Sequence, residues 1–283
     1  MPKRILITGG SGFIASYVAR VCLERNYEVI LQSRATDLSS GLFPIQSVTL
    51  LTTSFLSPEL ESLGDVDCII HLASAGVSPR NAEWSVLEDV NIRGTLSICQ
   101  LAKKKKARLV IAGSYAEYGR SGLRFNEIPV DAPLEPTFPY AVSKAAGCQL
   151  SLGYARAEGL RLAYLRIFNA FGHGQHISNL WPSLLNAAES GQDFEMTKGE
   201  QVRDFVPVET VANQFVDTAI EIEMHQGSPY IANVGSGIPM SVREFSEYWW
   251  NKSKAQGQLK IGSKPYRDNE VMRFVPSLKP AYL

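Results

Sequence analysis

The stretch "TGGSGFIA", from Thr8 to Ala15, decides how the rest of the chain is interpreted. It directly follows the strand-like run "RILIT", and Gly9, Gly12 and Ala15 keep the spacing G-x-x-G-x-x-G/A where a helical pattern starts. Small residues let the backbone approach a pyrophosphate, whose charge the N-terminus of the following helix stabilises. A plain glycine-rich turn is the weaker interpretation, because strand, glycines and helix stand in the order that a dinucleotide site needs.

Strand-like apolar runs alternate with helical patterns through the first 171 residues. The runs are "RILIT", "YEVILQS", "SVTLL", "DCIIHLA", "ARLVIAGS" and "LRLAYLRIF", and one long helical pattern is "VLEDVNIRGTLSICQLAK". This alternation is typical of βαβ units, whose parallel strands are covered by helices on both faces. We therefore expect an α/β protein: a doubly wound parallel sheet in residues 1–171 and a smaller C-terminal lobe in residues 172–283. Some later segments should return to the first domain.

The composition excludes several classes of partner. The chain has 283 residues, of which 45% are hydrophobic, and its 28 Lys and Arg balance 28 Asp and Glu. It should be soluble and globular, without a global field that recruits nucleic acid or an anionic membrane, and no apolar run of about 20 residues could span a bilayer. The four cysteines show no Cys-x-x-Cys spacing, which argues against a zinc site or a disulfide framework and favours a reducing cytoplasm. We expect no metal, because the His173 and His176 pair lies in a glycine-rich loop without other ligands.

The stretch "YAVSK" places Tyr140 and Lys144 four positions apart in a helical pattern that begins after Pro139. Residues at this spacing project from the same face of a helix, so a phenol and an ammonium would point the same way. Such a pair can exchange a proton, although many proteins carry the same spacing on a solvated helix face.

The end of the second strand bears on the choice of dinucleotide. An NAD site usually has an acidic residue there for the ribose 2′-hydroxyl, whereas "VILQSRA" offers Ser33 and Arg34. A hydroxyl and a guanidinium would bind a 2′-phosphate. These residues favour NADP(H) over NAD, although NAD stays possible. The alternative is that Arg34 is only a solvated loop residue.

With these motifs the chain resembles the extended short-chain dehydrogenase/reductases, in particular the nucleotide-sugar epimerases, dehydratases and reductases with a Rossmann sheet. The resemblance runs nearly end to end, through "TGGSGFIA", "HLA", "GSYAEYG", "YAVSK", "RIFNAFG", "RDFV" and "NVGSG". It implies a catalytic group of Ser114, Tyr140 and Lys144, in which the ammonium lowers the pKa of the phenol so that Tyr140 can exchange a proton near neutral pH. The resemblance also implies a set of cofactor-binding positions: Gly9, Gly12, Phe13, Ile14, Ser33, Arg34, Leu72, Ala73, Tyr140 and Lys144.

The resemblance places the nucleotide sugar in the second lobe. The substrate-binding positions that it implies are Asn169, Asn179, Arg203 and Arg267. The two arginines would hold the diphosphate, because a guanidinium fork suits phosphate oxygens. It also suggests a homodimer through the helices around residues 81–105 and 138–158. Members of the family usually continue into a Gly-Trp-x-Pro stretch and a final helix, whereas this sequence stops at "SLKPAYL", so that it is either trimmed or lacks that helix.

The segment "SYAEYG" separates the reactions of the family. Related 4,6-dehydratases carry one or two acidic residues directly after the catalytic Ser or Thr, and here those positions hold Tyr115 and Ala116. Glu117 follows one place later and should point elsewhere. The short strings "GEQVRDFV" and "YRDNEVM" look most like reductases that complete deoxy sugars on CDP or related carriers. We therefore expect NADPH-dependent reduction of a nucleoside-diphosphate 4-keto-6-deoxy sugar, with an epimerase that retains NAD as the alternative and a non-catalytic NADP-binding sensor or scaffold as the rival of another class.

Overall fold

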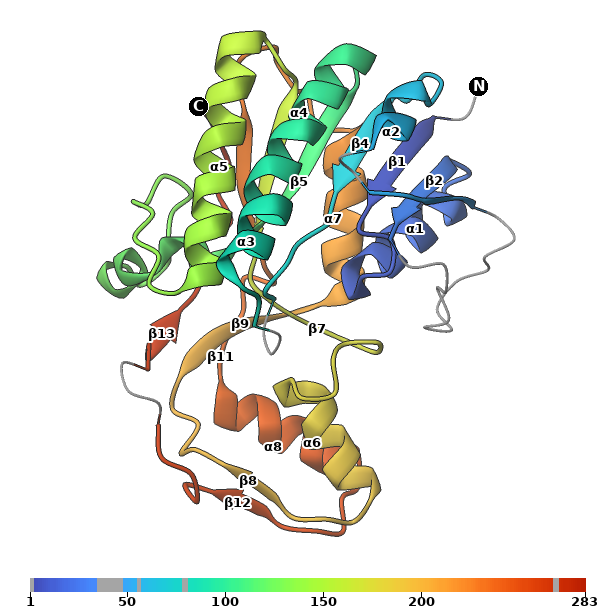
Figure 1. Cartoon of the computed structure of the whole chain (residues 1–283). Coiled ribbons are helices and arrows are strands. Elements are labelled where there is room, and N and C mark those ends of the chain that lie inside the picture. The colour runs from blue at the N-terminus through green and yellow to red at the C-terminus, as the bar shows by residue number, and fades with distance from the viewer. Residues whose placement is uncertain (1–2, 35–47, 55–56, 78–80, 267–269) are drawn as a thin grey trace.

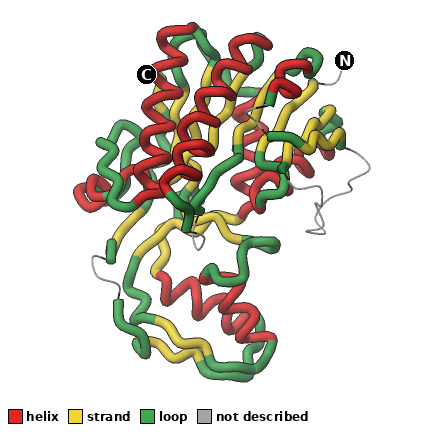
Figure 2. The backbone as a smooth tube through the Cα atoms, viewed as in Figure 1, coloured by secondary structure: helices red, strands yellow, loops and turns green. Residues whose placement is uncertain are grey.

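The structure is a computed structural model that describes residues 3–34, 48–54, 57–77, 81–266 and 270–283. Figure 1 shows a large sheet covered by helices, with a smaller lobe of strands and helices beneath it. Figure 2 shows the same division by element type: the long helices flank the sheet, and the small lobe is rich in loops.

The large sheet has eight strands among the described residues. From one edge to the other they are β14 (Ala281–Tyr282), β10 (Tyr230–Val234), β6 (Leu162–Ile167), β5 (Arg108–Ser114), β4 (Cys68–His71), β1 (Arg4–Thr8), β2 (Glu28–Ser33) and β3 (Thr49–Thr52). All neighbours are parallel except β14, which pairs antiparallel with β10. The chain order reverses between β1 and β4, and in such sheets ligands bind at the carboxyl ends of the strands at this point. The predicted doubly wound parallel sheet is confirmed.

Helices cover both faces of the large sheet (Figure 1). One apolar core lies between the sheet and α1 (Phe13–Glu24) with α7 (Val208–Ile220), and the other lies between the sheet and α4 (Gly94–Lys105) with α5 (Pro139–Glu158). The central strands are buried along nearly their whole length, as a parallel sheet covered on both faces requires. The shorter helical elements on this lobe are α2 (Pro58–Ser62), α3 (Trp84–Leu87), the π-helical η2 (Glu88–Arg93) and the 3₁₀ turns η3 (Tyr115–Tyr118) and η4 (Arg120–Arg124).

Local chemistry explains where α5 begins and ends. Pro139 occupies its first turn, where a missing backbone N–H costs nothing, and Gly159 ends it with φ of 66°. Tyr140 and Lys144 therefore stand in the first two turns, at the carboxyl end of the sheet.

The long helical pattern expected around residues 86–103 is divided in the structure. α3, η2 and α4 follow one another, with a π-helical turn at Glu88–Arg93. Such turns occur most often as local widenings of an α-helix and frequently lie at functional sites.

The smaller lobe is built around β9 (Val202–Pro207). β9 pairs with β7 (Asn169–Phe171), β11 (Pro239–Ser241) and β13 (Arg273–Phe274). The lobe also holds α6 (Leu180–Glu189), α8 (Val242–Lys252) and the pair β8 (Phe194–Met196) and β12 (Leu259–Ile261). Aromatic rings join these elements: Phe171 contacts Phe245 at 5.1 Å and Trp249 at 5.8 Å between ring centroids.

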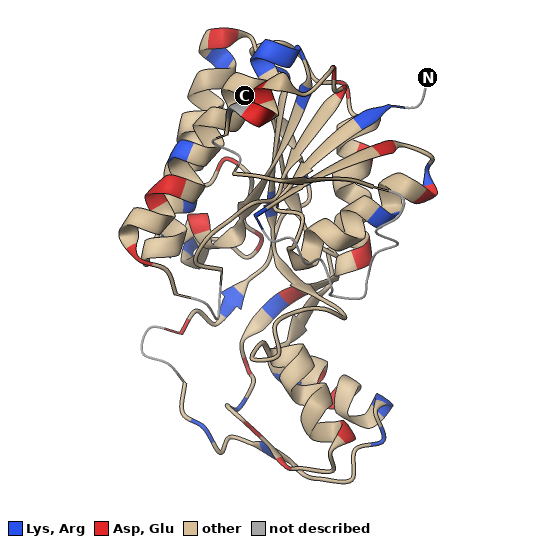
Figure 3. Cartoon of the chain, turned by 45° about the vertical axis from the view of Figure 1, so that its right-hand side comes forward, with Lys and Arg blue, Asp and Glu red and all other residues tan. Residues whose placement is uncertain are grey.

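Three described elements that follow residue 171 belong to the large sheet or its cover: α7, β10 and β14. The chain first leaves the large sheet after β6, which ends at Ile167, and β7 already pairs with β9. The division into domains at residue 171 stays a prediction. Acidic and basic residues are intermixed over the outer elements in Figure 3, in keeping with 28 of each.

Candidate active site

The glycine loop lies at the point where the strand order reverses. Gly9 has φ of +74°, and a Cβ built on it would stand 2.7 Å from the backbone N and Cα of Ala73. The loop can therefore approach the end of β4 only because residue 9 is glycine. The Gly12 amide donates to the Gly9 carbonyl at 2.8 Å, and Gly12 is the N-cap of α1 without a side chain to cover the first-turn amides. This small cradle at a helix N-terminus fits a pyrophosphate.

The other expected cofactor positions surround this cradle. Phe13 and Ile14 form the first turn of α1 and are half-buried, while Leu72 and Ala73 follow β4 directly. Ser33 is buried as the last residue of β2, and Arg34 behind it is exposed.

The side chain of Gln32 also contacts the glycine loop, although no sequence motif predicted this contact. Its side-chain carbonyl accepts from the Gly9 amide at 3.3 Å, and its side-chain amide donates to the Thr53 carbonyl at 2.5 Å. The side chain thereby ties the glycine loop to β2 and to the end of β3.

The structure brings Ser114, Tyr140 and Lys144 together. Ser114 is the last residue of β5, and its hydroxyl and that of Ser74 hydrogen-bond the phenol of Tyr140. Lys144 lies one turn after Tyr140 and is 4% exposed, and its Nζ donates to the Ala112 carbonyl at 2.7 Å. The phenol and the ammonium thus stand at the end of β5, as their helical spacing predicts.

The pKa of the Tyr140 phenol differs from the value near neutrality that the family resemblance implied. Burial raises the pKa of the phenol to about 12; the hydrogen bonds from Ser114 and Ser74 oppose this, and the Glu117 carboxylate adds to it. Lys144 itself has its pKa lowered by burial, with Glu117 acting in the opposite direction. The expected lowering of the phenol pKa toward neutrality is wrong for this structure, because burial outweighs the two hydrogen bonds that lower the pKa, and Glu117 and Tyr115 raise it further. Tyr140 is protonated at neutral pH and can act as a proton donor.

Asn91 in the π-helical turn supports the catalytic group. Its side-chain oxygen accepts from the Ala75 amide at 2.9 Å and from the Ser74 hydroxyl at 3.2 Å. Its side-chain NH₂ donates to the Ala75 carbonyl at 3.0 Å and to the Ser143 hydroxyl at 2.8 Å. One amide therefore fixes the segment after β4 against the start of α5. Neither Ser74 nor Asn91 was expected, because they lie far from Tyr140 in the sequence.

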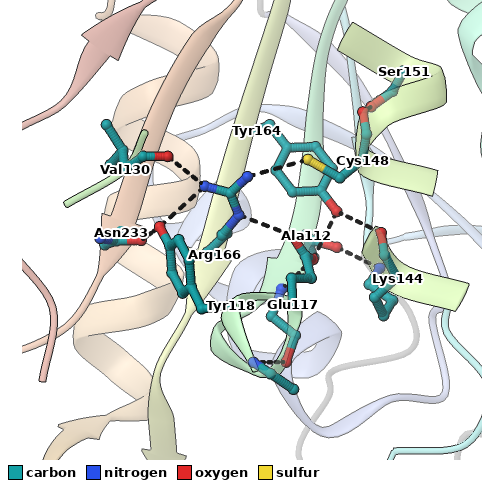
Figure 4. Close-up of polar contacts among 12 residues, drawn as sticks. Ala112, Glu117, Tyr118, Val130, Lys144, Cys148, Ser151, Tyr164, Arg166 and Asn233 are labelled. Atoms are coloured by element: carbon teal, nitrogen blue, oxygen red, sulfur yellow. Dashed lines mark hydrogen bonds and ion pairs between the residues drawn. The ribbon is translucent and has the colours of Figure 1, made fainter. Parts of the chain in front are cut away.

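Glu117 lies behind the catalytic group rather than in front of it. It forms a capping box with Ser114, whose amide donates to Glu117 Oε1 at 2.7 Å. The carboxylate is fully buried and pairs with Arg166 at 2.8 Å (Figure 4). The spacing Ser-x-x-Glu, a known helix-start signal, was present in the sequence and could have indicated this contact.

The expected substrate positions lie in the smaller lobe as far as the structure describes them. Asn169 on β7 donates to the Asp204 carbonyl at 3.1 Å, and Asn179 is the N-cap of α6. Arg203 on β9 is largely buried and pairs with Glu270 at 2.8 Å. Arg267 lies outside the described residues, so its expected role stays a prediction.

Tyr115 connects the catalytic group with the smaller lobe. Its ring packs on Phe168 and Phe274, with centroids 5.6 and 5.4 Å away, and Phe274 is the register partner of Arg203. Burial lowers the pKa of Arg203, and Tyr115 and Glu270 oppose this lowering. Tyr115 also acts on Tyr140, so its ring lies between the site at the end of β5 and Arg203 on β9.

Within the described part of the chain, no cluster of three or more His, Cys, Asp or Glu side chains is arranged to hold a metal ion. The same residues include no helix with the length and apolarity required to cross a membrane.

Comparison with known proteins assigns the class. Residues 5–235 match the NAD dependent epimerase/dehydratase family. A putative UDP-glucose 4-epimerase of Methanocaldococcus jannaschii is 30% identical over 294 residues, covering 98% of this chain and 90% of the relative. CDP-abequose synthase of Salmonella typhimurium is 22% identical over 284 residues, covering 99% and 91%. Among solved structures, MoeE5 in complex with UDP-glucose and NAD is 25% identical with a TM-score of 0.82, covering 98% of this chain and 90% of MoeE5.

The chain belongs to the NAD dependent epimerase/dehydratase family, and it is an oxidoreductase-type enzyme of the nucleotide-sugar group. The resemblance drawn from the sequence motifs is confirmed at this level.

Proposed function

We propose that the protein reduces the C4 carbonyl of a nucleoside-diphosphate 4-keto-6-deoxy sugar with NADPH. The observation that carries this proposal is the Tyr140 phenol, which is hydrogen-bonded to Ser114 and held protonated by burial. Reduction of a carbonyl needs a proton donor at the developing alkoxide, and a neutral phenol is such a donor.

The residues of the chain take separate roles in this reaction. The nicotinamide cofactor supplies the hydride when it is bound. Tyr140 gives its proton to the carbonyl oxygen of the sugar, and Ser114 orients that oxygen through a hydrogen bond. Lys144 holds a positive charge one helical turn away, which favours the phenolate that remains after proton transfer.

Elimination of water is disfavoured by the same site. The two positions that carry acidic residues in related dehydratases hold Tyr115 and the buried Ala116. The next carboxylate, Glu117, is fully buried and engaged by Arg166. At these positions, the described site therefore has no free carboxylate that could act as acid or base in the elimination of water.

The glycine cradle supports a dinucleotide, and MoeE5, of similar fold, was solved with NAD. The preference for NADPH is the finer part of the proposal. It rests on Ser33 at the end of β2 and on the exposed guanidinium of Arg34, which suits a 2′-phosphate.

An epimerase that retains NAD is the second candidate. It is favoured by the 30% identity to a putative UDP-glucose 4-epimerase, which exceeds the 22% identity to CDP-abequose synthase. A non-catalytic sensor or scaffold would need neither the Ser114 contact nor the buried Lys144, and both are present.

Two measurements distinguish these functions. Protein is first denatured after purification and the released nicotinamide is identified, since a retained NAD would favour the epimerase. Purified protein is then given NADPH with CDP- or dTDP-4-keto-6-deoxyglucose, and separately UDP-glucose without added cofactor. We expect NADPH consumption and a product that gains two hydrogens. Formation of the 4-epimer of UDP-glucose without NADPH consumption would replace the reductase by the epimerase.

The role of Tyr140 is tested by Tyr140→Phe, with Tyr154→Phe on the same helix as the matched control. Loss of the general acid should lower kcat by about 10²–10⁴-fold and leave NADPH affinity nearly unchanged. The control should retain wild-type kcat. Near-normal turnover of Tyr140→Phe would contradict the assignment.

We also propose a homodimer in the cytoplasm. The supporting observation is an apolar patch on α3 and the start of α5, where Trp84, Val86, Phe138 and Val142 are exposed by 57%, 42%, 48% and 38%. Sedimentation velocity would report the oligomeric state, and a monomer at all concentrations would contradict it.

A further inference from the structure

The buried cluster behind the catalytic group is organised around the carboxylate of Glu117. Its Oε2 accepts from Arg166 Nε at 2.8 Å, and its Oε1 accepts from the Tyr164 hydroxyl at 2.8 Å and the Ser114 amide at 2.7 Å (Figure 4). Glu117, Arg166 and Tyr164 are exposed by 2% or less. Three donors, one on β5 and two on β6, thus hold one carboxylate in a single position.

The surroundings are shaped to hold this carboxylate. A Cβ on Gly113 would stand 2.3 Å from Cε1 of the Tyr164 ring and 3.0 Å from Glu117 Oε1, so that only glycine leaves room beside them. Arg166 is fixed in turn, because its Nη1 donates to the Val130 carbonyl at 2.9 Å and to the Tyr118 hydroxyl at 3.0 Å.

The cluster lies close to a second buried cation. Lys144 is 4% exposed, and its Nζ donates to a backbone carbonyl. Its backbone carbonyl lies 3.4 Å from the hydroxyl of Tyr164, which also donates to Glu117. A buried ammonium is costly unless a negative charge lies nearby.

Among the described residues, the other titratable groups around Lys144 and Tyr140 do not supply that charge. Burial raises the pKa of Cys148 to about 12 and that of Tyr164 well above its usual value, so both stay neutral. Burial lowers the pKa of His71 on β4 to about 3, which keeps it neutral as well. Tyr115 also acts on Tyr140, and it raises the pKa of the Tyr140 phenol.

We propose that Glu117 is a positioning residue for catalysis, which fixes Ser114 through its backbone amide and serves as the counter-ion that keeps Lys144 charged. Glu117 does not reach the substrate space and acts through these two residues. The inference rests on the proposed catalytic roles of Ser114, Tyr140 and Lys144.

Glu117→Gln tests the proposal, because it keeps the shape of the side chain and removes its charge. Glu117 raises the pKa of both Tyr140 and Lys144, so both values should fall when the charge is lost. Reduction requires protonated Tyr140. We therefore expect the alkaline limb of the kcat/KM profile to move to lower pH by about one unit, with a lower kcat and an unchanged KM for the nucleotide sugar.

A second readout needs no substrate. In protein with carbon-labelled lysine, the Cε resonance of Lys144 is assigned by its loss in Lys144→Met and titrated with pH. The midpoint of this titration should also fall in Glu117→Gln, because Glu117 raises the pKa of Lys144. If no nucleotide sugar is turned over even by the wild type, the proposed function fails, while this titration still tests Glu117.

Two variants complete the design. Tyr164→Phe removes a donor to Glu117 but keeps the charge of the carboxylate. The alkaline limb of its kcat/KM profile and the midpoint of its Lys144 titration should match those of the wild type. Glu117→Gln leaves Arg166 unpaired. If this variant does not fold, the double variant Glu117→Gln/Arg166→Met replaces it. The same shifts of the alkaline limb and of the Lys144 midpoint are expected, because Glu117 acts on the pKa values of Tyr140 and Lys144. A wild-type limb and a wild-type Lys144 midpoint in the folded variant would overturn the proposal.

Discussion

The glycine loop makes a quantitative prediction at Gly9. An alanine there keeps φ of +74° only at a cost, and its Cβ would stand 2.7 Å from two backbone atoms of Ala73. A left-handed backbone costs about 1–2 kcal/mol for a residue with a Cβ, and relief of the overlap costs about 1–3 kcal/mol. Gly9→Ala should therefore lose about 2–5 kcal/mol of stability, which for a chain of this size lowers Tm by roughly 5–15 °C.

The assay is thermal unfolding with and without cofactor, and Gly153 on α5 supplies the matched control. A Cβ at Gly153 meets no atom within 4 Å, so Gly153→Ala should be neutral or gain about 0.5–1 kcal/mol. Addition of NADPH should also raise the Tm of Gly9→Ala less than that of the wild type, because the displaced loop no longer fits the pyrophosphate. A Gly9→Ala protein with wild-type Tm and wild-type cofactor affinity would refute the reasoning.

Two further predictions concern arginines. Arg34→Ala should weaken the binding of NADPH by about 1.5–3 kcal/mol and leave the affinity for NADH nearly unchanged in fluorescence titrations, since only NADPH carries the 2′-phosphate. Equal losses of affinity for both cofactors would show Arg34 to be a surface residue. Arg203→Ala should weaken a free nucleoside diphosphate by about 1.5–3 kcal/mol in isothermal titration and leave NADPH unchanged, with the exposed Arg243→Ala as control. Unchanged diphosphate affinity would remove Arg203 from the proposed phosphate clamp.

The parts of the structure that could be predicted from sequence depend on local signals. The buried runs, the glycine spacing and the proline that starts α5 each act within a few residues, and they led to the parallel sheet and to the position of Tyr140 and Lys144. The π-helical turn at Glu88–Arg93 was not predicted, because its apolar pattern hardly differs from that of an α-helix.

The electrostatics of the site could not be predicted in the same way. The pKa of Tyr140 depends on burial, on Ser74 and on Glu117, and these come from separate segments that only the fold brings together. The resemblance to the family implied that Lys144 lowers the phenol pKa, but neither the motif nor the helical spacing carries information about desolvation. Glu117 is the exception, since its capping-box spacing from Ser114 was visible in the sequence.

The return of α7, β10 and β14 to the large sheet affects how such enzymes can be recombined. A single splice after β7 would carry most of the proposed substrate-binding residues, but it would also replace the β10 and β14 strands at one edge of the sheet and the α7 cover of its core. The foreign strands would then have to match the register of β6, where Ile231 stands opposite Tyr164. Specificity in this architecture is better exchanged as several short grafts within β7–β9 and β11–β13 than as one contiguous block.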